Sequence, residues 1–155
     1  MTHAITSFGR TLVVAGLVLA TAAASASLRQ ATPRSTGSEA AIEVVRRYYR
    51  AIDARDYPTA WAQWGRRGRP GQTYAAFRQG FAATRTVRLT VTGPARIEGT
   101  AGSVYVTVPV QVDAVSRART RQRFSGEYVV RRTNVDGATA GQRQWLLYSA
   151  TLKTH

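Results

Sequence analysis

The chain has 155 residues, 44% of them hydrophobic, and its formal net charge is +14. This length supports one domain with its own core, and the basic excess favours anionic partners. Lys153 is the only lysine, so the charge is carried by arginine and indicates a compositional bias of the genome rather than nucleic-acid binding. The absence of cysteine excludes disulfides, and with so few histidines we expect no metal site and no cofactor.

The first 26 residues have the features of an export signal. Arg10 closes a short basic start, residues 11–24 (TLVVAGLVLATAAA) are apolar or small, and Ala24-Ser25-Ala26 supplies the pattern that signal peptidase requires. The apolar run is shorter than the roughly 20 residues that a membrane-spanning helix needs. We therefore expect a signal peptide over 1–26 that is cleaved after Ala26, and a periplasmic or secreted protein. An uncleaved anchor, which alone would bring membrane contact, is the alternative.

A linker and a first helix follow the signal. Residues 27–37 (SLRQATPRSTG) lack periodicity and predict a linker, which leaves a domain over 38–155. Thr36 and Glu39 fit a capping box, and Ser38 is an alternative cap. The stretch 38–54 then has apolar residues at helical spacing, which predicts a helix. These residues are Ile42, Val45, Tyr49 and Ile52.

Two shorter helices are predicted next. Asp56 can cap the first of them, with Pro58 in its opening turn and Gly65 at its end. Thr73 can cap the second. Both carry aromatic residues at helical spacing, which indicates faces that pack against a core. These aromatic residues are Trp61 and Trp64 in one helix, and Tyr74, Phe77 and Phe81 in the other.

From residue 85 onward the apolar residues alternate, which is typical of strands. The strands are expected around 87–91, 104–112, 124–130 and 143–153, with hairpin links at 99–102, 113–117 and 133–142. Pro109 cannot donate to a ladder, so we expect a bulge or an unpaired edge there. Helices followed by antiparallel strands indicate the α+β class, with the helices packed on one face of a sheet.

Two segments resemble the nuclear transport factor 2-like superfamily, in particular its small exported members. They are AAIEVVRRYYRAIDARDYPTAWAQWG (40–65) and RQRFSGEYVVRR (121–132), the latter followed by WLLYSATL (145–152). The resemblance covers about 38–155. It implies a cone-shaped α+β domain, related to the cystatin-like fold, in which N-terminal helices and a curved antiparallel sheet enclose a pocket. Members use such a pocket as an enzyme site, as a ligand-binding cavity, or not at all.

The aromatic residues of the predicted helices and strands are expected either to fill the core or to line that pocket. An apolar pocket with few polar groups suits a hydrophobic small molecule. The partner would be such a ligand or an envelope component, and the outer face of the sheet could form a homodimer. The candidate pocket residues are Tyr49, Trp61, Trp64, Phe77, Phe81, Phe124, Tyr128 and Trp145.

Catalytic groups are scarce. An isomerase- or cyclase-like enzyme of this superfamily needs a buried carboxylate as base, whereas the acids here fall at helix starts, turns and outward strand positions. After cleavage His155 would be the only histidine, so a histidine-aspartate pair or a serine nucleophile with a histidine base is not expected. We therefore predict a non-catalytic binding domain. An enzyme using the same pocket and a tethered component of an envelope assembly are the alternatives.

A row of arginines is the remaining candidate site. Arg117, Arg119, Arg121 and Arg123 are spaced by two and would form one row on a strand. Such a row is either a strip for an anionic partner or the solvated face opposite Phe124.

Overall fold

The computed structural model describes residues 34–155, so the predicted signal peptide and the first part of the linker lie outside the described residues. Within this range the helices precede the strands, as predicted. The elements are α1 (Arg34–Asp53), α2 (Tyr57–Ala62), α3 (Tyr74–Gly80), β1 (Thr84–Val91), β2 (Arg96–Thr100), β3 (Ser103–Ser116), β4 (Arg121–Thr133) and β5 (Leu146–Thr154).

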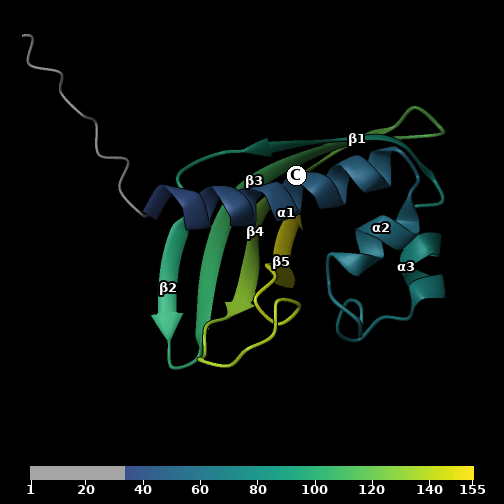
Figure 1. Cartoon of the computed structure of the whole chain (residues 1–155). Coiled ribbons are helices and arrows are strands. Elements are labelled where there is room, and N and C mark those ends of the chain that lie inside the picture. The colour runs from purple at the N-terminus through teal and green to yellow at the C-terminus, as the bar shows by residue number, and fades with distance from the viewer. Residues whose placement is uncertain (1–33) are drawn as a thin grey trace, which may run out of the picture. The chain divides into compact units, whose positions relative to one another are not determined.

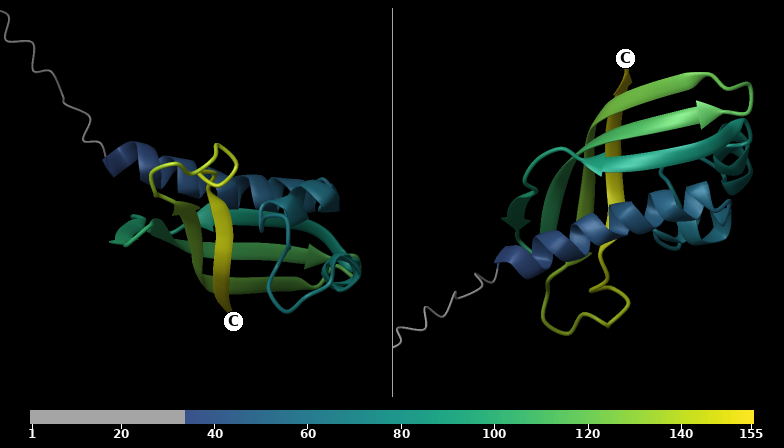
Figure 2. Two further views of the ribbon diagram at one scale, coloured as in Figure 1. Left: turned by 60° about the horizontal axis from the view of Figure 1, so that its bottom comes forward. Right: turned by 90° about the horizontal axis from the view of Figure 1, so that it is seen from above.

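None of the helices described is long and apolar enough to cross a membrane. The long helix α1 lies across one face of the sheet, while α2 and α3 lie at one end of it (Figure 1). The strands curve strongly, as the views in Figure 2 show. The helices therefore cover one sheet face and leave the other to solvent, which is the predicted α+β arrangement.

Helix α1 is buried along two adjacent stripes. The predicted apolar residues are at most 7% exposed, and a second stripe that includes Val44 and Tyr48 is equally buried. The helix begins at Arg34, earlier than predicted, so Thr36 and Ser38 lie inside its first turns rather than at a cap. The predicted linker is thus helical from Arg34 onward. The predicted stripe consists of Ile42, Val45, Tyr49 and Ile52.

The two short helices begin at the predicted caps. The Asp56 side chain accepts a hydrogen bond from the backbone N–H of Thr59 (3.2 Å), and the Thr73 hydroxyl accepts one from the backbone N–H of Ala76 (3.2 Å). These side chains satisfy donors that helix starts leave free. Helix α2 ends at Ala62, ahead of the predicted stop.

The strands form one antiparallel sheet in the order β1-β3-β4-β5, with β2 also paired to β3. Strand β2 was not predicted, because residues from 99 onward were expected to be a hairpin link. Its residues (RIEGT) are all exposed, and with a single large apolar side chain they lack the alternation that indicates a strand. The chain turns back after Thr100 and pairs it with Ser103.

Pro109 lies where the neighbour of β3 changes. Strand β1 pairs with β3 as far as Val110, and the pairing of β2 begins at Thr107. Thr92 lies in the segment between β1 and β2, and its backbone N–H donates a hydrogen bond to the carbonyl of Pro109 (3.0 Å). The missing N–H of the proline therefore faces the gap between β1 and β2, so an inner strand accommodates the proline without a bulge.

Candidate functional site

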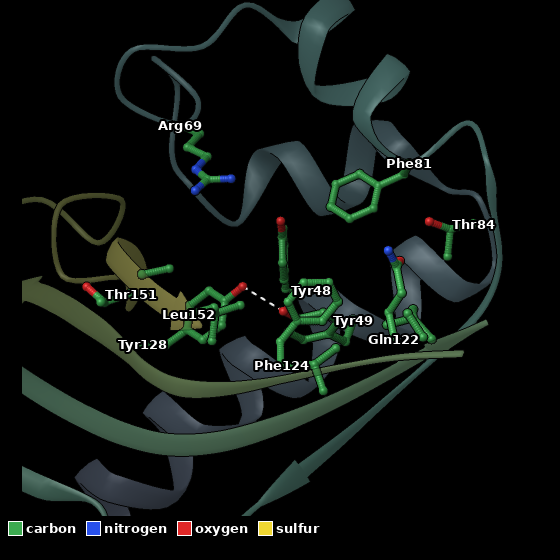
Figure 3. Close-up of a pocket in the computed structure, with 14 residues that line it drawn as sticks. Tyr48, Tyr49, Arg69, Phe81, Thr84, Gln122, Phe124, Tyr128, Thr151 and Leu152 are labelled. Atoms are coloured by element: carbon green, nitrogen blue, oxygen red, sulfur yellow. Dashed lines mark hydrogen bonds between the residues drawn. The ribbon is translucent and has the colours of Figure 1, made fainter. Parts of the chain in front are cut away.

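A pocket of about 470 Å³ lies between the helices and the sheet face that they cover. Tyrosines from α1 and β4 line its base, and residues of the α2–α3 loop, the end of α3 and strands β1, β3, β4 and β5 form its walls (Figure 3). We call it the tyrosine pocket. Its apolar walls are Phe81, Val87, Val112, Ala114, Phe124, Ala150 and Leu152, and its polar groups come from Tyr48, Tyr49, Tyr128, Arg69, Thr84, Gln122 and Thr151.

The base of the pocket is a cluster of buried phenols. Tyr48, Tyr49 and Tyr128 are 1%, 6% and 3% exposed. The hydroxyls of Tyr49 and Tyr128 share a hydrogen bond of 2.8 Å (Figure 3), and their rings meet edge to face with centroids 5.8 Å apart. Only one of the two hydroxyls donates its proton to this bond. The other hydroxyl accepts the bond and can donate its own proton to a further acceptor.

Burial keeps these phenols neutral. Desolvation raises the pKa of Tyr48 and of Tyr49 well above the ordinary value, and it does the same for Tyr128. Tyr128 raises the pKa of Tyr48 further, and Tyr49 raises the pKa of Tyr128. The charge of Arg69 lowers the pKa of both, and the hydroxyl of Tyr48 also lowers that of Tyr128. The pocket therefore presents neutral O–H donors rather than phenolates.

Arg69 supplies the positive charge of the pocket. Its side chain extends from the α2–α3 loop toward the Tyr48 hydroxyl (Figure 3), and its guanidinium lies 5.4 Å from the ring centroid of Trp64. The ion pairs of the described residues use other arginines, and no carboxylate among those residues pairs with Arg69. A half-buried guanidinium without an acid favours an anionic ligand group.

Gly126 shapes the wall between β4 and β5. It occupies the inward strand position between Phe124 and Tyr128 and pairs with Leu152. A Cβ at this position would lie 1.9 Å from the carbonyl oxygen of Thr151, which lines the pocket. Only glycine allows the two strands this close approach.

Carboxylates are placed elsewhere. Among the described residues none lines the tyrosine pocket. Asp53, for example, accepts a hydrogen bond from the backbone N–H of Val87 (2.8 Å) and so joins α1 to β1. Within residues 34–155 no group of His, Asp and Glu side chains gathers in the number that a metal ion requires.

The structure brings only some of the predicted pocket residues together. Tyr49, Phe81, Phe124 and Tyr128 line the tyrosine pocket. Phe77 is fully buried in the core, and Trp61 packs against it with ring centroids 5.1 Å apart. The other two tryptophans lie outside the pocket as well: Trp64 is buried beneath Arg69, and Trp145 stacks with Arg132.

The predicted arginine row is not formed on one strand. Strand β3 continues through Ser116 and β4 begins at Arg121, so Arg117 and Arg119 lie in the turn between them. All four arginines are exposed, and the backbone of Arg119 adopts a positive φ of 66°. Arg123 forms an ion pair with Asp113 (2.8 Å) on the outer sheet face. The sequence spacing continued across a turn, where strand periodicity no longer applies.

These features define an α+β domain in which N-terminal helices pack against an antiparallel sheet and a pocket lies between the two. The sequence matches no family model and no curated protein.

Solved structures identify the fold. A nuclear transport factor 2-like superfamily protein from Salmonella enterica is 15% identical, with a TM-score of 0.54, over 77% of this chain and 92% of that one. A protein from Novosphingobium aromaticivorans, provisionally named a scytalone dehydratase, is 14% identical (TM-score 0.55, 79% and 86%). A provisionally named dehydratase of the nuclear transport factor 2-like family from Streptomyces avermitilis is 17% identical (TM-score 0.51, 77% and 96%). The chain therefore has the nuclear transport factor 2-like fold, as its sequence predicted.

Proposed function

We propose that the chain is an exported, non-catalytic binding domain whose tyrosine pocket holds a small apolar molecule with an anionic head group. The observation that carries this proposal is the pairing of Arg69 with neutral phenols in a pocket that no described carboxylate lines. The pocket volume of about 470 Å³ falls in the range of ligand sites, about 300–1,000 Å³. The apolar body of the ligand would contact Phe81 and Phe124.

The orientation of the ligand follows from the distribution of polar groups. Its head group would accept hydrogen bonds from the Arg69 guanidinium and from the Tyr48 hydroxyl, toward which that guanidinium extends (Figure 3). Donors to an anion contribute more than donors to a neutral group, because charge strengthens the hydrogen bond. A carboxylate should therefore bind better than a neutral amide on the same ring system.

Catalysis in the same pocket is the alternative. Two of the similar structures carry provisional dehydratase names, and an isomerase- or cyclase-like reaction would also fit a pocket of this kind. Such reactions need a general base within reach of the substrate. The described residues that line the pocket include no Asp, Glu or His, and this favours binding over catalysis.

Calorimetric titration with 2-naphthoate and 2-naphthamide tests the binding proposal. We expect the carboxylate to bind at least about tenfold more tightly than the amide, and Arg69→Gln to remove that preference. Arg66→Gln is the matched control, since Arg66 is in the same loop but does not line the pocket. Equal affinity of the wild-type protein for the two compounds, or no binding of either, would contradict the proposal.

Export is the second part of the proposal, and it rests on the sequence of residues 1–26. The intact mass of protein recovered from its natural compartment tests it. A first residue at Ser27 supports a cleaved signal, whereas a retained segment supports the tethered alternative.

A further inference from the structure

A second pocket, of about 500 Å³, lies at the start of β5 and does not share its lining with the tyrosine pocket. It is bounded by the α2–α3 loop, the end of β4 and the β4–β5 loop, whose ribbons Figure 1 shows at the lower edge of the molecule. The backbone N–H of Leu147 donates to the carbonyl of Gln63 (2.8 Å), which joins β5 to the end of α2 beside this pocket. Its basic lining residues are Arg67, Arg131 and Arg132, and we call it the arginine groove.

Aromatic faces, rather than acids, hold two of these arginines. The guanidinium of Arg132 lies 4.9 Å from the ring centroid of Trp145, and that of Arg131 lies 5.8 Å from the ring of Tyr105 and 6.0 Å from the ring of Tyr148. Arg131 also donates to the Ser103 hydroxyl through Nε (3.1 Å) and a terminal nitrogen (2.9 Å). These contacts orient the guanidiniums without neutralising them.

The charge of the groove is uncompensated. The ion pairs of residues 34–155 use Arg46, Arg50, Arg96 and Arg123, and within that range no carboxylate lines the groove. Several like charges on one concave surface attract anions more strongly than the same charges spread over a flat face.

Arg132 has a donor that nothing in the described chain satisfies. Its Nε is buried and has no hydrogen-bond partner. A buried N–H without an acceptor is costly, and natural structures rarely keep one without a reason. Because Arg132 lines the groove, a small rotation of its side chain would present this donor to an oxygen of a bound anion.

We propose that the arginine groove is a binding site for a phosphate group. Guanidinium forks match phosphate oxygens with paired hydrogen bonds, so Arg67 and Arg132 together suit a doubly charged oxyanion. The groove is larger than a phosphate, and its remaining polar side chains suit the hydroxyls of a sugar or polyol that carries one. Those side chains are Thr133, Gln142, Gln144 and Ser149. This site is independent of the ligand proposed for the tyrosine pocket.

Calorimetric titration of the full-length protein with inorganic phosphate at low ionic strength tests the site. We expect saturable binding that weakens with added salt, and a loss of at least about tenfold in affinity in Arg132→Gln and, separately, in Arg67→Gln. Arg67 is an exposed loop residue, so its variant tests the site even if Arg132→Gln impairs folding. Arg66→Gln removes the same charge from the same loop outside the groove and should bind phosphate like the wild type.

Two outcomes would overturn the proposal. One is the absence of phosphate binding to the folded wild-type protein. The other is an equal loss in Arg66→Gln and Arg67→Gln, because that would show a response to net charge alone. If phosphate binds as expected, glucose 6-phosphate and vesicles containing phosphatidic acid show which kind of molecule carries the phosphate group. Tighter binding of the soluble ester identifies a free metabolite, and tighter binding of the vesicles identifies a lipid head group.

Discussion

The tyrosine pocket and the arginine groove have similar volumes, about 470 and 500 Å³, but opposite chemistry. The base of the tyrosine pocket consists of phenols that burial keeps neutral. Above them lie apolar walls and one guanidinium. The second has several guanidiniums and amide side chains at its surface. The comparison shows that the described fold offers two binding environments, and that the side chains rather than the volume decide what each accepts.

The α2–α3 loop connects the two environments. Arg67 lines the groove, Arg69 lines the tyrosine pocket, and Gly68 lies between them. Gly68 has a positive φ of 68°, and a Cβ there would lie 1.8 Å from the ring of Trp61. Glycine at this position therefore lets the loop fold tightly over Trp61 and place neighbouring arginines in different pockets.

Alkaline pH should have the largest effect on the tyrosine pocket and little effect on the arginine groove. Because burial raises the pKa of Tyr48, Tyr49 and Tyr128 in the folded state, the unfolded chain loses these protons first, above about pH 10. The free energy of unfolding is thus unaffected by these groups below that pH and falls above it. Three protons correspond to about 4 kcal/mol per pH unit. Urea unfolding at a series of pH values from about 9 to 11 measures the slope.

The matched variant for this experiment is Tyr49→Phe. It removes one of the three protons, so the slope should decrease by about 1.4 kcal/mol per pH unit. Phosphate binding by the folded protein should not change between about pH 8 and 10, because arginine stays protonated in proteins. A free energy of unfolding that stayed constant up to about pH 11 would show that the phenols ionise without unfolding.

Gly126→Ala should damage the tyrosine pocket and leave the groove intact. The added methyl would meet the carbonyl oxygen of Thr151 and force β4 and β5 apart. We expect a loss of about 3 kcal/mol in the free energy of unfolding, in the range of overpacked cores. Gly99→Ala in β2 is the control, since a Cβ there meets nothing within 4 Å. Urea unfolding measures both variants, and equal effects of the two would rule out the close strand approach as the cause.

Most of the fold was predictable because its signals are local. The alternation of valines in β3, the caps Asp56 and Thr73 and the apolar period of α1 each depend on neighbouring residues only. The exceptions are segments that tertiary contacts define. Strand β2 exists because it pairs with β3, and the turn that carries Arg117 exists because β3 extends through Ser116.

The site was less predictable than the fold. Aromatic residues that fill the core and those that line the pocket have the same periodicity, so Phe77 and Phe81 could not be distinguished. Tyr48 directly precedes Tyr49 and so lies outside the predicted apolar stripe of α1. It is buried because a second stripe of that helix is also covered. Arg69 lies in the loop between α2 and α3, and a loop residue has no periodic pattern that shows where its side chain points.

The hydrogen bond at the base of the tyrosine pocket gives the smallest of the expected effects. Tyr49→Phe leaves the Tyr128 hydroxyl buried without its 2.8 Å partner, and Tyr128→Phe does the reverse. Each single change should lower the free energy of unfolding at neutral pH by about 1 kcal/mol, because it removes one bond and leaves a polar group unsatisfied.

A double-mutant cycle shows whether the two hydroxyls act as a unit. Replacing both by phenylalanine removes the unsatisfied group together with the bond, so the double variant should lose no more than either single one, a coupling of about 1 kcal/mol. Urea unfolding of the four proteins at neutral pH measures it, and phosphate affinity should be the same in all four because neither tyrosine lines the groove. Strict additivity would mean that the hydroxyls are satisfied independently. In that case the spare proton at the base of the pocket would not be available to orient a ligand head group, and recognition there would depend on Tyr48 and Arg69 alone.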